Sequence, residues 1–216
     1  MSDYEVTELN RVTRLPNRGH YDRETIHRII DEALICHVAF VADGQPFIIP
    51  TIHARTGDTI ILHGAKANRM LRHIEGGNRV CIGMTLLDGI VFARSVFHHS
   101  MNYRSVVLFG TGSAIEADEE KLRALELLTE KIARGRWKEA RLPTTKELAA
   151  TSVISVTIET ASAKIRTGPP KDDEEDYSLP VWAGVLPLAL QPLQPITDPN
   201  SRTTLPPSVT NYCISP

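Results

Sequence analysis

The clearest fold signal in this chain comes from residues 98–116, HHSMNYRSVVLFGTGSAIE. The second half, residues 105–116, is rich in apolar and β-branched residues and predicts one long strand. Gly110 and Gly112 interrupt that strand, and glycines inside a strand are typical of a bulge or a sharp bend. A barrel needs such bends, so this segment favours a sheet that curls into a β-barrel.

The first half of the same segment is unusually polar for a bend between strands. Two apolar runs, residues 90–93 and 106–109, flank a series of hydrogen-bonding side chains: Arg94, Ser95, His98, His99, Ser100, Asn102, Tyr103, Arg104 and Ser105. Such a density of donors at the ends of buried strands suits a polyanionic or heteroaromatic ligand. The alternative is a solvated polar hairpin.

The rest of the chain predicts short strands joined by tight turns, with a few helices inserted. Asp22 is expected to cap an amphipathic helix on which His27 is exposed, and Thr144 and Glu147 form a capping box. The expected strands are residues 36–41, 47–52, 59–63, 80–86, 90–97, 105–116 and 153–159, with helices over 68–74 and from Asp118. The predicted fold class is mainly β with helices, an antiparallel sheet closing into a barrel.

Composition limits the classes of function. The chain has 216 residues, 42% hydrophobic and 23% charged, which fits one sizeable domain. Its net charge of −2 gives no general reason to expect nucleic-acid or membrane binding, so any anion site must be local. No signal peptide or transmembrane run is expected.

Cysteine usage and the C-terminal composition add two further expectations. Cys36, Cys81 and Cys213 lack metal-binding spacing, so we expect no metal site and a reduced, cytoplasmic compartment. After residue 190 the chain becomes rich in Pro, Thr, Ser and Asn. We therefore predict a domain over residues 1–190 and an extended or disordered tail over residues 191–216.

A second candidate site is residues 63–69, HGAKANR, which run from a strand end into a helix. A helix start offers free N–H groups, Lys66 and Arg69 add positive charge, and Gly64 permits close backbone approach. Together these features predict a phosphate cradle, and the alternative is a solvated basic turn. Trp182, on a loop between prolines, fits either a core plug or a lid over a flat ligand.

Taken together, five segments resemble one known group of proteins across residues 12–188. They are RLPNRGHYDRETI, CHVAFVADGQPFIIPTIHAR, LHGAKANRML, FHHSMNYRSVVLFG and TGPPKDDEEDY with VWAGVLPL. The chain resembles the FMN-binding split-barrel superfamily of pyridoxamine 5′-phosphate oxidases, in its nitroimidazole-resistance-like, flavin-nucleotide-binding branch. The resemblance implies a six-stranded split barrel in each protomer and a homodimer with FMN, or FAD, in clefts across the interface.

The resemblance also implies roles for individual residues. The strand Ile49, Pro50, Thr51 and Ile52 would run along the isoalloxazine ring. The phosphate would be held by His63, Gly64, Lys66, Asn68 and Arg69. The segment from Asn102 to Ser105 would reach the flavin from the partner subunit, with Ser105 where the oxidases have glutamine. Trp182 matches their C-terminal tryptophan, which packs by the flavin, and Arg94 is a further candidate for binding the cofactor.

One departure from the oxidases changes the expected chemistry. After the tryptophan, the oxidases carry an Arg-x-His-Asp-Arg segment for the substrate phosphate, whereas this chain reads AGVLPLALQP. Oxidation of pyridoxine phosphate is therefore not expected. We expect instead reduction of a small, flat, nitroaromatic or quinone-like substrate, with NADH or NADPH as a candidate electron donor.

The candidate catalytic residues are His98, His99 and Arg104, which with Arg94 would stabilise charge on reduced flavin or donate a proton. Two alternatives stay open. One is a flavin carrier or sensor without turnover. The other is a haem-binding split barrel with His98 or His99 as the axial ligand.

Overall fold

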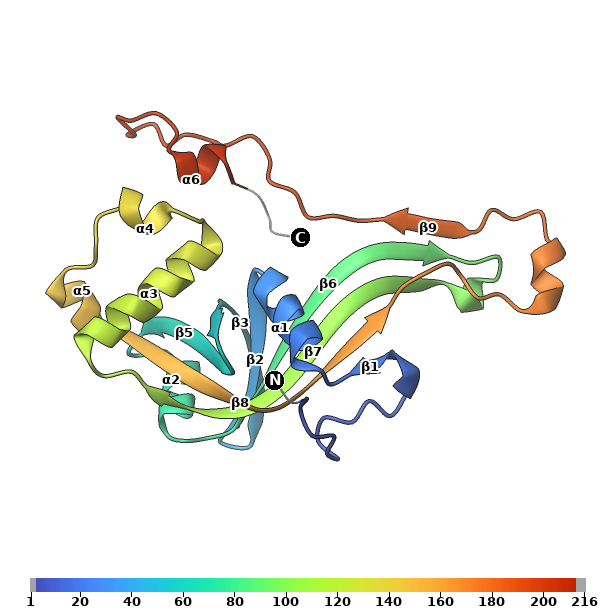
Figure 1. The fold of residues 1–216 in the computed structure, drawn as a ribbon, viewed down its shortest axis with the longest axis horizontal. Coiled ribbons are helices and arrows are strands. Elements are labelled where there is room, and N and C mark those ends of the chain that lie inside the picture. The colour runs from blue at the N-terminus through green and yellow to red at the C-terminus, as the bar shows by residue number, and fades with distance from the viewer. Residues whose placement is uncertain (1–2, 213–216) are drawn as a thin grey trace.

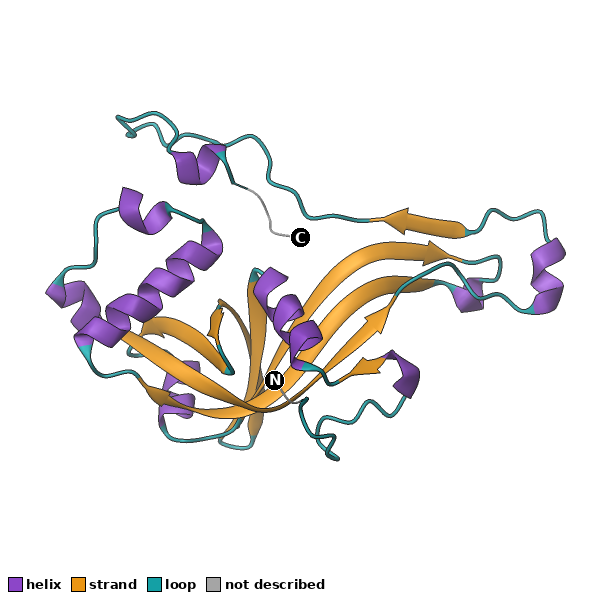
Figure 2. Cartoon of the chain, in the orientation of Figure 1, coloured by secondary structure: helices purple, strands orange, loops and turns teal. Residues whose placement is uncertain are grey.

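The computed structural model describes residues 3–212 and is built on one nine-stranded antiparallel sheet (Figures 1 and 2). The main strand order is β3-β2-β6-β7-β8-β5-β4, with β1 paired to β8 and β9 paired to β6. The strands are β1 Gly19–His20, β2 Ile35–Ala42, β3 Gln45–Ile52, β4 Ala54–Thr56, β5 Thr59–Ala65, β6 Val80–Phe92, β7 Ser100–Ala114, β8 Thr151–Arg166 and β9 Gly184–Pro187.

Six α-helices accompany the sheet within the described residues. They are α1 Arg23–Glu32, α2 Arg69–Glu75, α3 Asp118–Ile132, α4 Arg136–Glu139, α5 Thr145–Ala150 and α6 Pro207–Thr210. Asp22 accepts a hydrogen bond from the Thr25 N–H and caps α1, and both bonds of the Thr144–Glu147 capping box are present. These predictions are confirmed. Across residues 3–212, no helix has the length and apolar character needed to cross a bilayer.

The sheet curls around a core but remains open. Its two outer strands, β3 and β4, are not paired with each other, which confirms the split-barrel architecture. The curled face encloses α1 and α2, whose buried residues meet those of the sheet: Ile26, Ile29, Ile30, Met70, Leu71, Ile74, Leu62, Ile82, Leu108, Ile154 and Val156. A smaller cluster packs α3 against the opposite face through Ala54, Ile61, Ala124, Leu128 and Val153.

The predicted bend at Gly110 is confirmed. The β7–β8 register shifts between Phe109 and Gly110. A Cβ added at Gly110 would lie 1.9 Å from the carbonyl oxygen of Thr157 on β8. A Cβ at Gly112 would lie 2.6 Å from Ile74 Cγ2 of α2. Both glycines therefore permit backbone approaches that a side chain would block.

Two local expectations were wrong. Separate strands were expected over residues 80–86 and 90–97, with a turn between them at Asp88 and Gly89. Instead β6 continues through these two residues with a register irregularity, because β9 pairs with Gly89–Phe92 from the far side. His27 was expected to be exposed but is 8% exposed. The N-terminal segment covers it, and its Nε2 lies 3.0 Å from Asp58 Oδ1 and 3.3 Å from the Tyr4 hydroxyl.

A second buried histidine makes stability depend on pH. His53 is fully buried, with Nε2 2.9 Å from the carbonyl oxygen of Ile30 and Nδ1 unpartnered among the described residues. Burial lowers the pKa of His53. A histidine whose pKa is lowered by folding contributes its full stabilisation at pH values above its unfolded-state pKa of about 6.5. This stabilisation is lost as the pH falls towards the folded-state pKa.

We therefore expect the free energy of unfolding to fall on acidification below about pH 6.5, with each such histidine contributing at most about 1.4 kcal/mol per pH unit. His53→Gln keeps an N–H donor for the Ile30 carbonyl oxygen and removes the titration of residue 53. The slope of unfolding free energy against pH should therefore be shallower in this variant. The slope should not vanish, because burial also lowers the pKa values of His27 and His63. Urea denaturation between about pH 5 and pH 7 measures the slopes, and identical slopes would contradict this assignment.

Candidate functional site

Two basic side chains project from the turn that joins β5 to α2. Lys66 and Arg69 are both exposed, and neither forms an ion pair within residues 3–212. The Arg69 guanidinium lies 4.6 Å from the ring centroid of Phe47 on β3. The turn therefore presents two uncompensated cations beside the open edge strand of the sheet.

The other residues of this turn have more specific roles than the sequence suggested. Asn68 Oδ1 accepts hydrogen bonds from the N–H groups of Met70 and Leu71, at 2.9 and 3.3 Å. The N–H groups of Met70 and Leu71 are therefore already capped by Asn68 rather than open to a ligand, which corrects that expectation for these two groups. A Cβ at Gly64 would lie 3.2 Å from Leu71 Cδ1, so this glycine also lets α2 pack against β5.

His63 supplies an unused acceptor beside the cations. Its Nδ1 atom is buried and has no hydrogen-bond partner in the described part of the chain. Burial lowers the pKa of His63, which favours the neutral ring. A neutral imidazole with a free nitrogen can bond a hydroxyl or an N–H group of a bound molecule.

The strand predicted to run along a flat ring is the open edge of the sheet. In β3, residues 45–52 pair with β2 on one side and with no strand on the other. Alternate backbone groups of Ile49, Pro50, Thr51 and Ile52 therefore face away from the sheet. Because Arg69 contacts Phe47 of β3, the structure brings this edge and the cationic turn together.

The polar segment at the start of β7 lies at the opposite end of the molecule. On β8, Ser152 pairs with Gly64 of β5, and Arg166 pairs with Tyr103 of β7. Fourteen residue steps at about 3.3 Å correspond to roughly 45 Å along the strand. In one chain, then, the long arm formed by β6, β7 and the end of β8 carries its tip far from the cationic turn (Figure 1).

At the tip of this arm, Arg94 is held by an ion pair. Its backbone N–H and Nη1 donate to Asp172 at 2.8 and 3.0 Å, and its guanidinium lies 5.0 Å from the Tyr177 ring centroid. Although burial favours the protonated acid, these bonds hold the pKa of the Asp172 carboxyl below its usual value. Arg94 therefore ties the loop after β8 to the end of β6.

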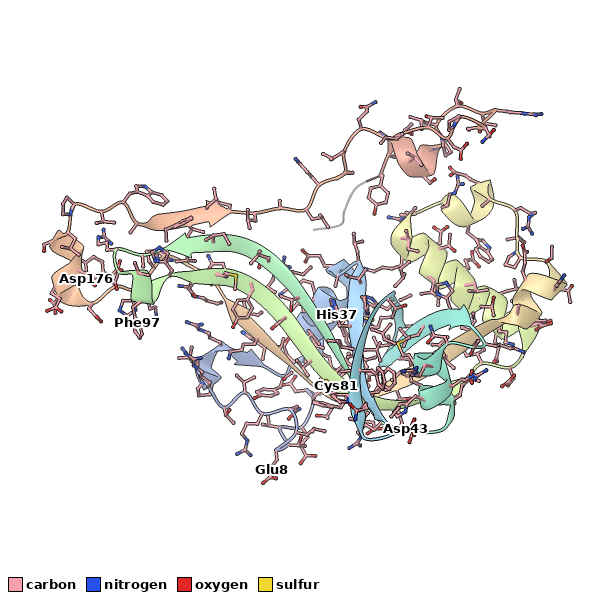
Figure 3. The ribbon with its side chains drawn as sticks, turned by 180° about the vertical axis from the view of Figure 1, so that it is seen from behind. Glu8, His37, Asp43, Cys81, Phe97 and Asp176 are labelled. Carbon is pink, nitrogen blue, oxygen red and sulfur yellow. The ribbon has the colours of Figure 1, made fainter. Side chains whose placement is uncertain are left out.

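The adjacent residues His98 and His99 use different ring nitrogens in their hydrogen bonds. His98 Nε2 donates to Asp173 Oδ2 at 3.2 Å. His99 Nδ1 lies 3.0 Å from the Ser95 carbonyl oxygen, which requires the proton on Nδ1 and leaves Nε2 unprotonated in the neutral ring. Figure 3 shows Phe97 and Asp176 at this end of the arm.

The ring of Phe92 contacts the rings of both His99 and Trp182. The rings of His99 and Trp182 lie 5.8 and 5.9 Å from the ring of Phe92. Trp182 is 70% exposed, which excludes the core plug as its role in the single chain. The arm therefore ends in an open aromatic face with one available imidazole nitrogen.

Arg104 is fully engaged inside the chain. It donates to both carboxylate oxygens of Glu32 and to Asp88, with Nη2 at 2.7 Å from each carboxylate. These bonds raise the pKa of Arg104, so its protons are not available for transfer. Its position assigns it to joining α1 and β6.

Asn102 and Ser105 also bond within the arm. Ser105 donates to the Lys164 carbonyl oxygen at 3.3 Å. Asn102 donates to the Gly168 carbonyl oxygen at 3.1 Å and accepts a hydrogen bond from Arg166.

Arg166 is buried, and the sequence did not point to it as a site residue. The only signal for Arg166 was its place at a strand end before Gly168. Its described partners are oxygens of Asn102, Gly168 and Pro169, all neutral.

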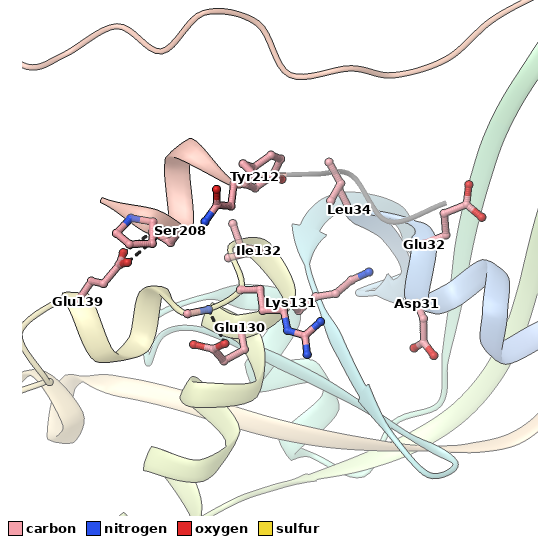
Figure 4. A pocket seen from close by; sticks show the side chains of 13 residues that line it. Asp31, Glu32, Leu34, Glu130, Lys131, Ile132, Glu139, Ser208 and Tyr212 are labelled. Carbon is pink, nitrogen blue, oxygen red and sulfur yellow. Dashed lines mark hydrogen bonds between the residues drawn. The ribbon is translucent and has the colours of Figure 1, made fainter. Parts of the chain in front are cut away.

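The described part of the tail forms a separate cavity of about 360 Å³ with the helices (Figure 4). Ser208 of α6 bonds Glu139 of α4 through its N–H, at 3.1 Å, and through its hydroxyl. Lys131, Asp31 and Tyr212 also line this cavity. Cys213 lies outside the described residues. No cluster of three or more His, Cys, Asp or Glu side chains within residues 3–212 could hold a metal ion.

The open antiparallel barrel, with its arm and its cationic turn, defines a split-barrel protein. A family model described as pyridoxamine 5′-phosphate oxidase matches residues 22–165. The chain therefore belongs to the pyridoxamine 5′-phosphate oxidase family. No protein of curated function matches the sequence.

Two solved structures with high similarity cover 90% or more of the chain, and a third covers about two thirds of it. The flavocytochrome Anf3 from Azotobacter vinelandii is 36% identical over 97% of this chain and 98% of its own, with a TM-score of 0.90. The FAD and haem binding protein from Mycobacterium smegmatis is 39% identical over 90% and 96%, with a TM-score of 0.85. A candidate 5-nitroimidazole antibiotic resistance protein from Bacteroides thetaiotaomicron, 24% identical over 68% and 86%, shares the fold with a TM-score of 0.58.

Proposed function

We propose that this protein binds a flavin, FMN or FAD, in a site built by two copies of the chain, and acts as a flavin-dependent oxidoreductase. One observation carries the proposal. The unpaired Lys66 and Arg69 lie beside the open β3 edge, whereas the arm with His99 and Trp182 is roughly 45 Å away along the same chain. A second copy of the chain, with its arm laid beside the turn of the first, would bring both parts to one ligand.

The residues present fit a flavin. Lys66 and Arg69 would hold the phosphate, and the orphaned Nδ1 of His63 would accept from a ribityl hydroxyl. The outward backbone groups of β3 would bond the polar rim of the ring. When bound, the flavin supplies the electron-transfer chemistry, and the protein orients it and sets its electrostatics. His99 of the arm would place its unbonded Nε2 atom beside the ring.

The arm also suits the proposed substrate class. Phe92, His99 and Trp182 present flat faces, which stack on planar nitroaromatic or quinone-like molecules. The segment after Trp182 supplies no arginine or histidine for a phosphate and instead forms β9 against β6. This arrangement supports a substrate other than pyridoxine phosphate.

Flavin titration followed by rapid mixing tests the proposal. The purified protein should acquire a yellow flavin spectrum with FMN or FAD, and the bound flavin should bleach on anaerobic mixing with NADH or NADPH. Reoxidation by a nitroaromatic or a quinone would complete the cycle. Failure to bind either flavin would reject the proposal, and binding without bleaching by either donor would favour a carrier or sensor.

Haem binding is a second candidate function, favoured by the geometry of His99. Two similar structures are described as a flavocytochrome and as an FAD and haem binding protein. An axial histidine ligand commonly donates its other ring N–H to a carbonyl or carboxylate oxygen. The Nδ1 atom of His99 makes this contact with Ser95 and leaves Nε2 available, whereas the Nε2 atom of His98 is bonded to Asp173.

The adjacent histidines give a matched comparison for haem binding. If His99 is an axial ligand, haem added to the purified protein gives a Soret band that His99→Ala shifts or abolishes. His98→Ala should leave the band within a few nanometres of its original position, because Nε2 of His98 is already engaged. Identical spectra for the wild type and both variants would remove His98 and His99 as ligands.

A further inference from the structure

After β9 the tail continues as a long exposed segment, residues 189–205, which we call the strap. All 17 residues from Ala189 to Leu205 are exposed in the single chain. Within the described range 3–212, the hydrogen bonds of the strap all stay inside the strap itself. Figures 1 and 3 show it running apart from the sheet and from α1. The strap is therefore held by its ends rather than along its length.

Both ends of the strap are anchored on the same chain. Before it, β9 pairs with β6 on the arm, and the Leu188 N–H donates to the Asp88 carbonyl oxygen at 3.0 Å. After it, the buried Ser208 of α6 donates to Glu139 of α4 through its N–H and its hydroxyl. These two anchors give an otherwise uncovered segment a fixed course between the arm and α4.

The side chains of the strap are of the kind that proteins usually bury. Leu190, Leu193 and Ile196 are 71%, 81% and 97% exposed, and no charged residue precedes Asp198. Several large apolar side chains exposed together mark an interaction site. The prolines of the strap restrict its backbone, so the segment loses less conformational entropy when it binds. The strap therefore has the properties of a segment prepared to contact a partner.

An open groove of about 490 Å³ lies where the strap leaves the arm. Its lining combines leucines with an ion-pair cluster: Leu34, Leu86, Leu87, Leu188, Leu190, Glu32, Asp88 and Arg104. Arg104 donates to both Glu32 and Asp88, so all three charged groups of the lining are paired with one another. The groove therefore offers an apolar surface without an uncommitted charge, which suits the side chains of another polypeptide more than a small ionic ligand.

The position of the strap favours a second copy of this chain as its partner. The strap continues from the arm, which carries the Trp182 and His99 side chains that the proposed flavin site places against a partner copy. A segment that begins at this contact lies beside the partner. The size agrees as well, because one side of a standard interface contributes about 20–30 residues, and the 17 exposed residues of the strap approach that number.

We propose that the strap is a clasp for a second copy of the chain, which it holds by burying Leu190, Leu193 and Ile196 against the partner. The inference rests on the two-copy arrangement of the proposed function and goes beyond it by assigning a role to the tail. Because the strap contacts the partner rather than the flavin, it controls how tightly the two copies associate and leaves the phosphate contacts of Lys66 and Arg69 unchanged.

Sedimentation velocity of the full-length protein over a range of concentrations tests the clasp. The wild type should form a dimer, and Leu193→Ser with Ile196→Ser should raise its dissociation constant at least about tenfold, because two aliphatic side chains lose their burial. Both side chains are largely exposed in the single chain, so folding should be unaffected. The matched control, Leu127→Ser with Leu142→Ser, changes two exposed leucines outside the strap and should leave the dissociation constant within about twofold.

Hydrogen exchange gives a second readout that needs no variant. The N–H groups of the strap before Asp198 have no acceptor within residues 3–212, so they should exchange rapidly in protein diluted to the monomer. In the dimer the clasp should slow their exchange, and equal rates in the two states would contradict it.

The outcomes separate the clasp from the proposed function. A dissociation constant that the strap variant leaves unchanged, or that both double variants raise equally, would overturn the clasp while leaving the two-copy site in place. Binding of the wild type but not the strap variant to phosphatidylcholine vesicles would identify a membrane as the partner and overturn it too. A dimer that binds neither flavin would reject the flavin function alone, whereas a monomer that binds flavin would reject the two-copy site and the clasp together.

Discussion

Replacing Gly110 with alanine is expected to lower the free energy of unfolding by about 3 kcal/mol or more. The added methyl carbon would lie 1.9 Å from the Thr157 carbonyl oxygen and 3.2 Å from Val156 Cγ1. The first neighbour is backbone of β8, so no side-chain rotation relieves the overlap. The β7–β8 register shift occurs at this position, and the two long strands would have to separate there.

Gly83→Ala is the matched control for this prediction. Gly83 lies in β6, in the same sheet, and a Cβ there would meet no atom within 4 Å. Alanine should be neutral or slightly stabilising at Gly83, because it restricts the unfolded chain. Urea denaturation followed by circular dichroism measures both variants. Equal stabilities for the two variants would show that the close approach at Gly110 is not what limits the fold.

The double substitution Lys66→Ala with Arg69→Ala is expected to weaken flavin binding by about a hundredfold or more. Each charge-assisted hydrogen bond to a phosphate contributes about 1.5–3 kcal/mol, and 1.4 kcal/mol corresponds to tenfold in Kd. Neither side chain has an ion-pair partner in residues 3–212, so removing both leaves no internal charge without its partner. Folding should be unaffected, and the loss should be seen in fluorescence titration with FMN and with FAD.

The control carries the same change in net charge at a distance from the turn. Lys138 on α4 and Lys146 on α5 are exposed, and alanine at both positions removes two positive charges. This control should bind flavin within about twofold of the wild type, because screened surface charges contribute little. A comparable loss in both double variants would indicate general electrostatic attraction rather than a phosphate cradle.

Local signals in the sequence were sufficient for the helix caps and for the bulge. Asp22, Thr144 and Gly110 act through neighbours within a few residues or through the absence of a side chain, and the structure confirms them. The continuation of β6 through Asp88 and Gly89 was not predictable in this way. It depends on β9, about a hundred residues further along the chain.

For the candidate site, the pattern of residues identified the cationic turn. It did not show which of the candidate side chains already have hydrogen-bond partners. The capping role of Asn68 could have been predicted from its place before a helix. The partners of Arg104 are 72 and 16 residues away, so nothing local indicated that its donors are taken.

The open edge of β3 also bears on aggregation. A free strand edge offers unpaired donors to any other strand, and Ile48 on this edge is largely exposed. Pro46 and Pro50 lack N–H groups. Each lies two residues from Ile48, so the backbone groups of all three residues face the same side of the strand. Because proline is tolerated in an edge strand only where its missing donor faces outward, these two residues interrupt the ladder that a second strand would need. The edge can thus remain open to a small planar molecule while resisting growth of the sheet from chain to chain.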